Sequence, residues 1–135
     1  MIGMVIVTHG KIGAEMLAAL NQIVGPQPCA KAVSIGTEDN METCRNVILT
    51  AIKDVNTGDG VVLLTDMFGG TPSNLALSLM PTANAIVLAG VNLPALVKLA
   101  SVRGSMPLLE AAREAEMAGR KYIQLVTENL ASKEE

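Results

Sequence analysis

Four short apolar runs are spaced along this chain, and a segment with helical periodicity follows each of them. The runs cover residues 2–8, 30–36, 61–66 and 84–90. Most are nearly continuous in hydrophobicity, which is typical of strands that are covered on both faces. A parallel strand needs a long crossover to reach its neighbour, and that crossover is usually a helix. The alternation therefore predicts helices packed on both faces of a mostly parallel sheet.

Helical spacing of apolar residues marks the segments between the runs. The first helix is predicted from about residue 10 to a stop signal at Gly25 and Pro26. Its predicted buried stripe consists of Ile12, Met16, Leu20 and Ile23. Another helix is predicted from residue 71, with Thr71 as its cap and Pro72 at its first helical position. Further helices are predicted over 41–55, 91–104 and 106–120, and a last strand over 121–130.

These elements predict one three-layer α/β domain of flavodoxin-like type over residues 1–135. If the first strand lies centrally, the strand order is 2-1-3-4, so the first and third strands are neighbours. Half of the residues are hydrophobic, yet the chain has no Trp, one Phe and one Tyr. The core is therefore expected to consist of Val, Ile, Leu, Ala and Met.

The charge pattern argues against several classes of function. The formal net charge is −3 and the Lys and Arg residues are scattered, so neither a basic patch nor an aromatic platform for nucleic acid is present. The apolar start lacks a basic leader and is too short to span a bilayer, so we expect a cytoplasmic protein without membrane insertion. Cys29 and Cys44 lack metal-ligand spacing and are expected to be small buried hydrophobic residues. We expect no metal and no cofactor.

The only histidine, His9, ends the first predicted strand. Ligands of open α/β sheets bind beyond the carboxyl ends of the strands, where the strand order reverses. Asp66 ends the third strand, and adjacent strands lie about 4.8 Å apart, so the two side chains can reach each other. A carboxylate that accepts the Nδ1–H leaves the Nε2 lone pair free as a nucleophile and stabilises the positive charge that grows on the ring.

A glycine pair and a helix start follow Asp66. Gly69 and Gly70 would let the backbone approach a ligand closely. The predicted helix start, including Ser73 and Asn74, would supply free N–H groups for a phosphate. Each feature also has an ordinary interpretation, because a histidine at a strand end, an aspartate at a turn and a Gly-Gly turn are common in proteins without a site. Their convergence on one predicted sheet edge favours a phosphohistidine site.

Three stretches resemble a known family. "VIVTHGKIGAEML", "LLTDMFGGTPSNLA" and "AGVNLPALV" are similar to segments of the IIA domain of the mannose-type phosphotransferase system, and the resemblance extends from residue 1 to about 123. It implies a phosphotransferase component in which His9 accepts a phosphoryl group on Nε2 and Asp66 is its hydrogen-bond partner. It also implies that Gly69, Gly70 and Thr71 belong to the phosphate-binding loop.

The resemblance further implies partners. The donor would be the histidine-containing phosphocarrier HPr, and the acceptor a IIB protein that serves sugar uptake through membrane IIC/IID subunits. Gly10 and Phe68 are expected to lie where the partner proteins dock. Members of the family form homodimers by exchanging a C-terminal antiparallel edge strand, for which residues 122–130 are the candidate. The chain has no IIB segment before Glu135, so we expect a free-standing IIA protein.

Three other functions share features with this pattern. A free-standing IIA protein can act mainly as a regulator that reports the phosphorylation state of the system. The phosphoryl donor subunit of dihydroxyacetone kinase has a similar strand-end histidine, but the known members have Ser after it and a Gly-Ser loop. A two-histidine phosphatase is excluded, because Thr8 stands where that chemistry needs arginine and no second histidine exists.

Overall fold

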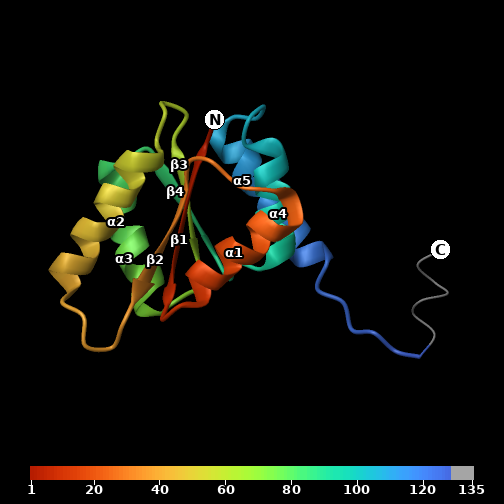
Figure 1. Ribbon diagram of the computed structural model, residues 1–135, viewed down its shortest axis with the longest axis horizontal. Helices are drawn as coiled ribbons and strands as arrows, with labels where there is room; N and C mark the ends of the chain where they lie inside the picture. The colour runs from red at the N-terminus through yellow and green to blue at the C-terminus, as the bar shows by residue number, and fades with distance from the viewer. Residues whose placement is uncertain (129–135) are drawn as a thin grey trace.

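Four parallel strands form one sheet in the computed structural model, which describes residues 1–128. The strands are β1 (Gly3–His9), β2 (Ala30–Ile35), β3 (Val61–Thr65) and β4 (Ala85–Ala89), in the order β2-β1-β3-β4. This confirms the predicted order and the central place of the first strand. In the register, Val7 of β1 is paired with Val33 on one side and with Thr65 on the other. All carboxyl ends therefore meet at one edge, which is the lower edge of the sheet in Figure 1.

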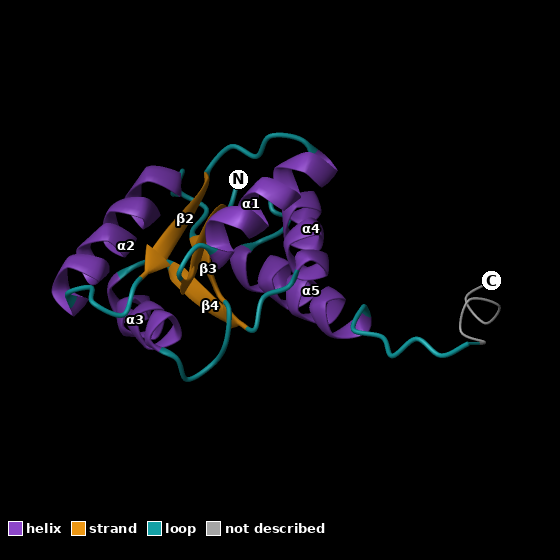
Figure 2. Ribbon diagram, turned by 60° about the horizontal axis from the view of Figure 1, so that its bottom comes forward, coloured by secondary structure: helices purple, strands orange, loops and turns teal. Residues whose placement is uncertain are grey.

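Helices cover both faces of the sheet (Figures 1 and 2). One layer contains α2 (Met41–Val55) and α3 (Thr71–Leu79), and a short 3-10 helix, η1 (Met80–Thr82), follows α3. The other layer contains α1 (Ile12–Val24), α4 (Leu93–Val102) and α5 (Leu108–Lys121). The predicted three-layer α/β fold is thus confirmed.

The hydrophobic core has two parts, one on each face of the sheet. Successive side chains of a strand point to opposite faces. Val5 and Val7 therefore face α2 and α3, whereas Met4 and Ile6 face α1, α4 and α5. All four are fully buried. The nearly continuous apolar runs of the sequence follow directly from this two-sided burial.

The buried face of α1 differs from the predicted stripe. Of the four predicted residues, Leu20 is buried and Met16 packs against the core, as predicted, whereas Ile12 and Ile23 are largely exposed. Gly13, which was not predicted, is also buried. The helix is turned so that its glycine meets the strand, which brings its axis closer to the sheet than a larger side chain would allow. The start of α3 also differs by one position, because Gly70 is the N-cap and Thr71 and Pro72 already belong to the first turn.

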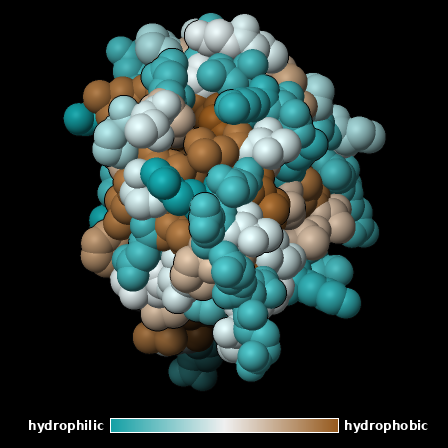
Figure 3. Space-filling model, turned by 90° about the vertical axis from the view of Figure 1, so that its left-hand side faces the viewer, coloured by the Kyte–Doolittle hydropathy of each residue, from teal (hydrophilic) through white to brown (hydrophobic). Residues whose placement is uncertain are grey.

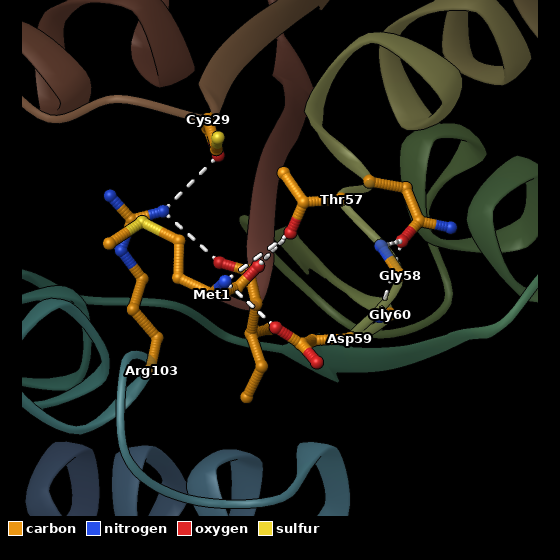
Figure 4. A network of polar contacts seen from close by, with 9 residues as sticks. Met1, Cys29, Thr57, Gly58, Asp59, Gly60 and Arg103 are labelled. Atoms are coloured by element: carbon orange, nitrogen blue, oxygen red, sulfur yellow. Dashed lines mark hydrogen bonds and ion pairs between the residues drawn. The ribbon is translucent and has the colours of Figure 1, made fainter.

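A buried arginine joins three segments at the end of the sheet where the strands begin, opposite the carboxyl ends (Figure 4). The Arg103 guanidinium donates to the carbonyl oxygens of Ile2, Cys29 and Pro28 and to the side chain of Gln27, at 2.6–3.2 Å. Burial lowers the pKa of this group. The four acceptors replace the water that the two terminal nitrogens of the guanidinium lose, whereas Nε has no hydrogen-bond partner within residues 1–128. Arg103 thereby ties the end of α4 to the start of β1 and to the loop before β2.

The outer strands, β2 and β4, each have one side that no other strand pairs with in residues 1–128. The side chains beside these two free edges differ in character. Beside β2, the Lys31 ammonium forms an ion pair of 2.6 Å with Asp54 of α2. Charged side chains of this kind discourage the addition of another strand. Figure 3, viewed from the side on which α2 lies, shows hydrophobic groups near the centre of that face with hydrophilic groups around them. Beside β4, the exposed side chains of Leu109 and Met117 border a groove of about 430 Å³.

The described part of the predicted last strand, residues 121–128, contains no strand in the single chain. Residues 123–128 leave α5 without strand structure and run away from the domain (Figure 1). Residues 129 and 130 of the predicted strand lie outside the described residues. An edge strand needs a neighbour for its hydrogen bonds, and this segment has none in one chain. The antiparallel edge strand stays a prediction.

Candidate functional site

The candidate site lies where β1 and β3 end side by side. His9 is the last residue of β1, and Asp66 directly follows β3. Since the two strands are parallel neighbours, the chain delivers both side chains to the same sheet edge. The turn 66–70 and the start of α3 complete this edge. The sequence-predicted placement of His9 beside Asp66 is therefore confirmed.

One oxygen of the Asp66 carboxylate contacts His9 twice. The imidazole Nδ1 lies 2.8 Å from Oδ2, and the backbone N–H of His9 donates to the same oxygen at 3.0 Å. The other oxygen, Oδ1, accepts the backbone N–H of Met67 at 3.0 Å. The Asp66 side chain is only 14% exposed, whereas the His9 ring is 48% exposed. The carboxylate is thus held from both ends while the ring reaches solvent.

The contacts with His9 determine the ionisation of Asp66. Partial burial is the strongest single influence and raises the pKa of the carboxyl. The hydrogen bonds from the His9 ring and backbone, together with the attraction to that ring, outweigh burial and bring the pKa below its ordinary value. Asp66 is therefore a carboxylate at neutral pH.

An ionised carboxylate also determines the tautomer of the ring. Because a carboxylate can only accept hydrogen bonds, Nδ1 of His9 must carry the hydrogen in their 2.8 Å contact. In the neutral imidazole, Nε2 is then without hydrogen and has a free lone pair. The geometry therefore presents a nucleophilic nitrogen to solvent and keeps a negative charge behind the ring.

The glycine loop lies against the imidazole. A Cβ atom added to Gly70 would be 2.9 Å from Cε1 of His9 and 3.4 Å from Nε2. Gly69 has φ +88°, a left-handed conformation that favours glycine, and a Cβ there would meet open space. Gly70 thus allows the backbone to touch the ring, and Gly69 allows the turn that brings it there.

The first turn of α3 presents its predicted phosphate-binding residues unequally. Thr71 is exposed at the start of the helix. Ser73 is fully buried, and its hydroxyl has no hydrogen-bond partner within residues 1–128. The side chain of Asn74 is exposed, but its backbone N–H already donates to the carbonyl of Gly70 at 2.9 Å. Of these three residues, Thr71 combines an exposed side chain with the first position of the helix, where N–H groups lack helical acceptors.

Several apolar side chains close to His9 or Asp66 in the sequence are exposed. Phe68 is 74% exposed, and Gly10 is exposed with φ +51°. Sequence reasoning missed Met67 and Ile12, which are also largely exposed. Their position within three residues of Asp66 or His9 was the available signal. Clustered apolar groups on a surface commonly mark a protein interaction site.

The two cysteines do not take part in this site. Cys44 is buried, as predicted, and burial raises the pKa of its thiol. Cys29 is only partly buried and has φ +52°, so the prediction that it is a buried residue is only partly right. Nowhere in residues 1–128 do three His, Cys, Asp or Glu side chains gather closely enough to hold a metal ion. Within the same residues, no helix has the length and hydrophobicity needed to cross a membrane.

Comparison with known proteins relates the chain and its fold to one group. The family model EIIA-man, described as "PTS system fructose IIA component", matches residues 3–117. The fructose-specific EIIA component of Bacillus subtilis is 28% identical over 131 residues, which are 96% of this chain and 90% of that protein.

Two further relatives give the same result. The mannose-specific EIIAB component of Escherichia coli K12 is 30% identical over 107 residues, or 78% of this chain. That match spans only 33% of the relative, so this chain is similar to about a third of its length. The structure of the mannose/sorbose-specific IIA subunit from Enterococcus faecalis superposes with a TM-score of 0.84 at 27% identity, covering 93% of this chain and 95% of that subunit.

Proposed function

The chain belongs to the EIIA-man family of IIA components of the sugar phosphotransferase system, and from this premise we propose that it is a cytoplasmic phosphohistidine carrier. In this proposal His9 receives a phosphoryl group from phosphorylated HPr and passes it to a IIB partner. The observation that carries the proposal is the 2.8 Å contact between Nδ1 of His9 and Asp66, which leaves Nε2 free.

The transfer is a substitution at phosphorus. The Nε2 lone pair of His9 forms the new N–P bond while the N–P bond of the donor phosphohistidine breaks, and the donor nitrogen keeps that electron pair. Positive charge grows on the His9 ring as the bond forms. The Asp66 carboxylate, which accepts the Nδ1–H, stabilises this charge and keeps the ring oriented. The same steps in reverse order deliver the group to the IIB acceptor.

The loop after Asp66 supports a phosphate next to Nε2. Gly70 touches the ring beside the reacting nitrogen, so its backbone is close enough to contact a transferred group. The first turn of α3 has N–H groups without helical acceptors, and its N-terminus carries about half a positive charge. We assign phosphate contacts to the backbone of Gly69 and Gly70 and to Thr71. Ser73 contributes through its place in the first turn of the helix, because its side chain is buried, and Asn74 contributes through its exposed side chain, because its N–H already donates to Gly70.

The exposure of the site suits protein partners. A ring that is half exposed can meet the histidine of a partner protein, whereas a ring in a deep cavity could not. Phe68, Met67 and Ile12 offer apolar contact area around it, and Gly10 leaves open space beside the ring. We assign the docking of both HPr and the IIB partner to this surface. Uptake of a sugar through IIC/IID subunits would follow downstream of the IIB partner.

A direct experiment tests the carrier function. The protein is incubated with phosphoenolpyruvate, enzyme I and HPr, and its intact mass is measured before and after mild acid. We expect one phosphoryl group that acid removes and that His9→Ala does not acquire. A chain that gains no mass while a known IIA protein in the same mixture does would contradict the proposal.

The C-terminal segment supports a homodimer in which edge strands are exchanged. Ile123, Leu125 and Val126 are largely exposed, Leu125 to 88%. The free edge of β4 is bordered by apolar Leu109 and Met117. An antiparallel strand from a second subunit would satisfy the unpaired backbone groups of β4 and cover these side chains. Light scattering after size exclusion tests this: we expect a dimer for the full chain and a monomer for a chain truncated after Tyr122. A monomeric full chain would contradict it.

A further inference from the structure

A buried hydrogen bond connects the residue before His9 to the helix after it. The hydroxyl Oγ1 of Thr8 accepts the backbone N–H of Gly13 at 2.7 Å, and both residues are buried. The residue at the N-cap of α1, Lys11, makes no side-chain cap bond within residues 1–128. Thr8 therefore performs the capping from the strand, satisfying one of the N–H groups that a helix start leaves free.

The bond depends on a glycine at its other end. A Cβ on Gly13 would lie 3.0 Å from Oγ1 of Thr8 and 3.2 Å from Cγ2 of Ile6. These distances are tighter than ordinary van der Waals contacts, and Ile6 is fixed in the core. A larger residue at 13 would push α1 away from β1 and lengthen the bond. Thr8 and Gly13 thus act together.

This bond holds the His9 backbone from the side opposite Asp66. Thr8 and His9 are adjacent in β1, so their side chains point to opposite faces of the sheet. Toward the end of β3, the backbone N–H of His9 donates to Asp66. The next N–H, that of Gly10, donates to the carbonyl of Ile35 in β2 at 3.0 Å. The Thr8–Gly13 bond supplies the third attachment, toward α1.

From these three attachments we propose that Thr8, together with Gly13, is a positioning residue for the phosphoryl-accepting His9. This inference rests on the proposed carrier function. Without the bond, the turn through Gly10 loses its attachment to α1, and the His9 backbone can rotate about the strand. The ring then leaves the position in which Nδ1 contacts Asp66 and Cε1 contacts Gly70. A displacement of about 1 Å at a reacting group can lower a rate by about 100-fold.

The test compares Thr8→Val with Thr8→Ser. Valine has the shape of threonine without the acceptor, and serine keeps the acceptor. We expect Thr8→Val to accept the phosphoryl group from phospho-HPr about 10- to 100-fold more slowly at saturating donor, with KM unchanged, and Thr8→Ser to retain the wild-type rate. Thr82→Val is the matched control, because it also loses a threonine hydrogen bond, to Leu79, but at the opposite sheet edge. It should retain the wild-type rate.

A second measurement separates positioning from loss of stability and needs no phosphoryl donor. Nitrogen-15 NMR of the His9 ring reports which ring nitrogen carries the hydrogen. We expect the Nδ1–H form in the wild type and in Thr82→Val, and a mixture of forms in Thr8→Val. If Thr8→Val does not fold, Gly13→Ala serves in its place with the same expected mixture. A wild-type ring spectrum in the folded variant overturns the proposal.

The two measurements also distinguish the proposals from each other. A wild-type chain that is never phosphorylated, but whose ring spectrum changes in Thr8→Val, contradicts the carrier function and retains the positioning role. A phosphorylated wild type with equal rates and equal spectra in Thr8→Val retains the carrier function and overturns the positioning role.

Discussion

A single oxygen of Asp66 accepts two hydrogen bonds from His9, one from ring Nδ1 at 2.8 Å and one from the backbone N–H at 3.0 Å. The backbone bond fixes where the residue lies, and the ring bond fixes how the imidazole is turned. Because both bonds end on one oxygen, a rotation of the His9 side chain breaks the ring bond and leaves the backbone bond in place. Asp66 is therefore both the anchor of the strand end and the partner of the ring.

Asp66→Asn should reverse the tautomer of His9. An amide NH₂ in place of Oδ2 can donate to Nδ1, which leaves the hydrogen on Nε2 and removes the lone pair proposed to attack phosphorus. If the amide oxygen takes this place instead, because it must also accept the backbone N–H of His9, the ring keeps its tautomer but loses the negative charge behind it. We expect phosphorylation to be at least about 100-fold slower, with the fold retained. Quenched-flow measurement of phosphoryl transfer tests this. Asp54→Asn, which removes an exposed ion pair with Lys31, is the control and should keep the wild-type rate. A wild-type rate in Asp66→Asn would contradict the proposal that Asp66 orients the His9 ring.

Acid should weaken the fold in part through Asp66. The pKa of this carboxyl is lower in the folded chain than its ordinary value of about 3.9. The unfolded chain therefore binds the proton more readily, and the stabilising contribution is complete above about pH 4 and disappears as the pH falls through the folded-state pKa. Urea unfolding at a series of pH values should show a smaller loss of stability on acidification for Asp66→Asn. Equal pH dependence in the two proteins would contradict this linkage.

Gly70→Ala should impair transfer without unfolding the protein. The backbone of Gly70 has φ −84°, which alanine adopts freely, so the main effect is the contact of 2.9 Å between the new Cβ and Cε1 of His9. We expect a rate lower by about 10- to 100-fold and a nearly unchanged melting temperature. Gly104→Ala, where a Cβ meets open space, is the control. If both variants transfer equally fast, the close approach of Gly70 has no role in the reaction.

Phe68→Ala should weaken docking and leave the chemistry intact. The side chain is 74% exposed, so its removal should not change the stability of the isolated chain. A buried aromatic contact in an interface commonly contributes 1–2 kcal/mol or more, so we expect KM for phospho-HPr to rise about fivefold or more with kcat unchanged. Val47→Ala, an exposed apolar change on α2, is the comparison and should leave KM alone. An unchanged KM in Phe68→Ala would place docking elsewhere.

Arg103→Met should destabilise the fold without affecting the site. The change removes the guanidinium donor from the carbonyl groups of Ile2 and Pro28 and one of the two donors from that of Cys29, whose oxygen still accepts the N–H of Met4. We expect this loss to cost about 2–4 kcal/mol. Urea unfolding measures this, with exposed Arg45→Met expected within about 0.5 kcal/mol of wild type. The folded fraction of Arg103→Met should still accept a phosphoryl group at the normal rate, because Arg103 lies at the opposite sheet edge. A decrease of less than about 1 kcal/mol in the free energy of unfolding would show that the hydrogen bonds of Arg103 are dispensable.

Most of the fold could be predicted from the sequence because its signals are local. Apolar runs of strand length, helical spacing, and stop signals such as Gly25 and Pro26 act over a few residues. Once the order 2-1-3-4 is inferred, the meeting of His9 and Asp66 follows as well, since parallel neighbours end at the same edge. The glycines after Asp66 also lie where that reasoning put them.

The remainder depended on contacts between distant segments. The helical periodicity predicted Ile12 on the buried face of α1, but α1 lies so close to β1 that Gly13 is the buried residue there. Ser73 looked like a ligand of phosphate, yet its side chain points into the core. Arg103 lies 101 residues from its acceptor Ile2, so no local sequence pattern predicts that it binds the start of β1.

The sequence by itself determined the elements, their order and the pair of residues at the site, because hydrophobic periodicity and parallel pairing are properties of short segments and of their succession. Only the tertiary structure decided which side of each helix is buried, which hydroxyl caps α1 and how closely Gly70 touches the imidazole. Those features depend on distances of a few tenths of an ångström between segments that are brought together only when the core is packed.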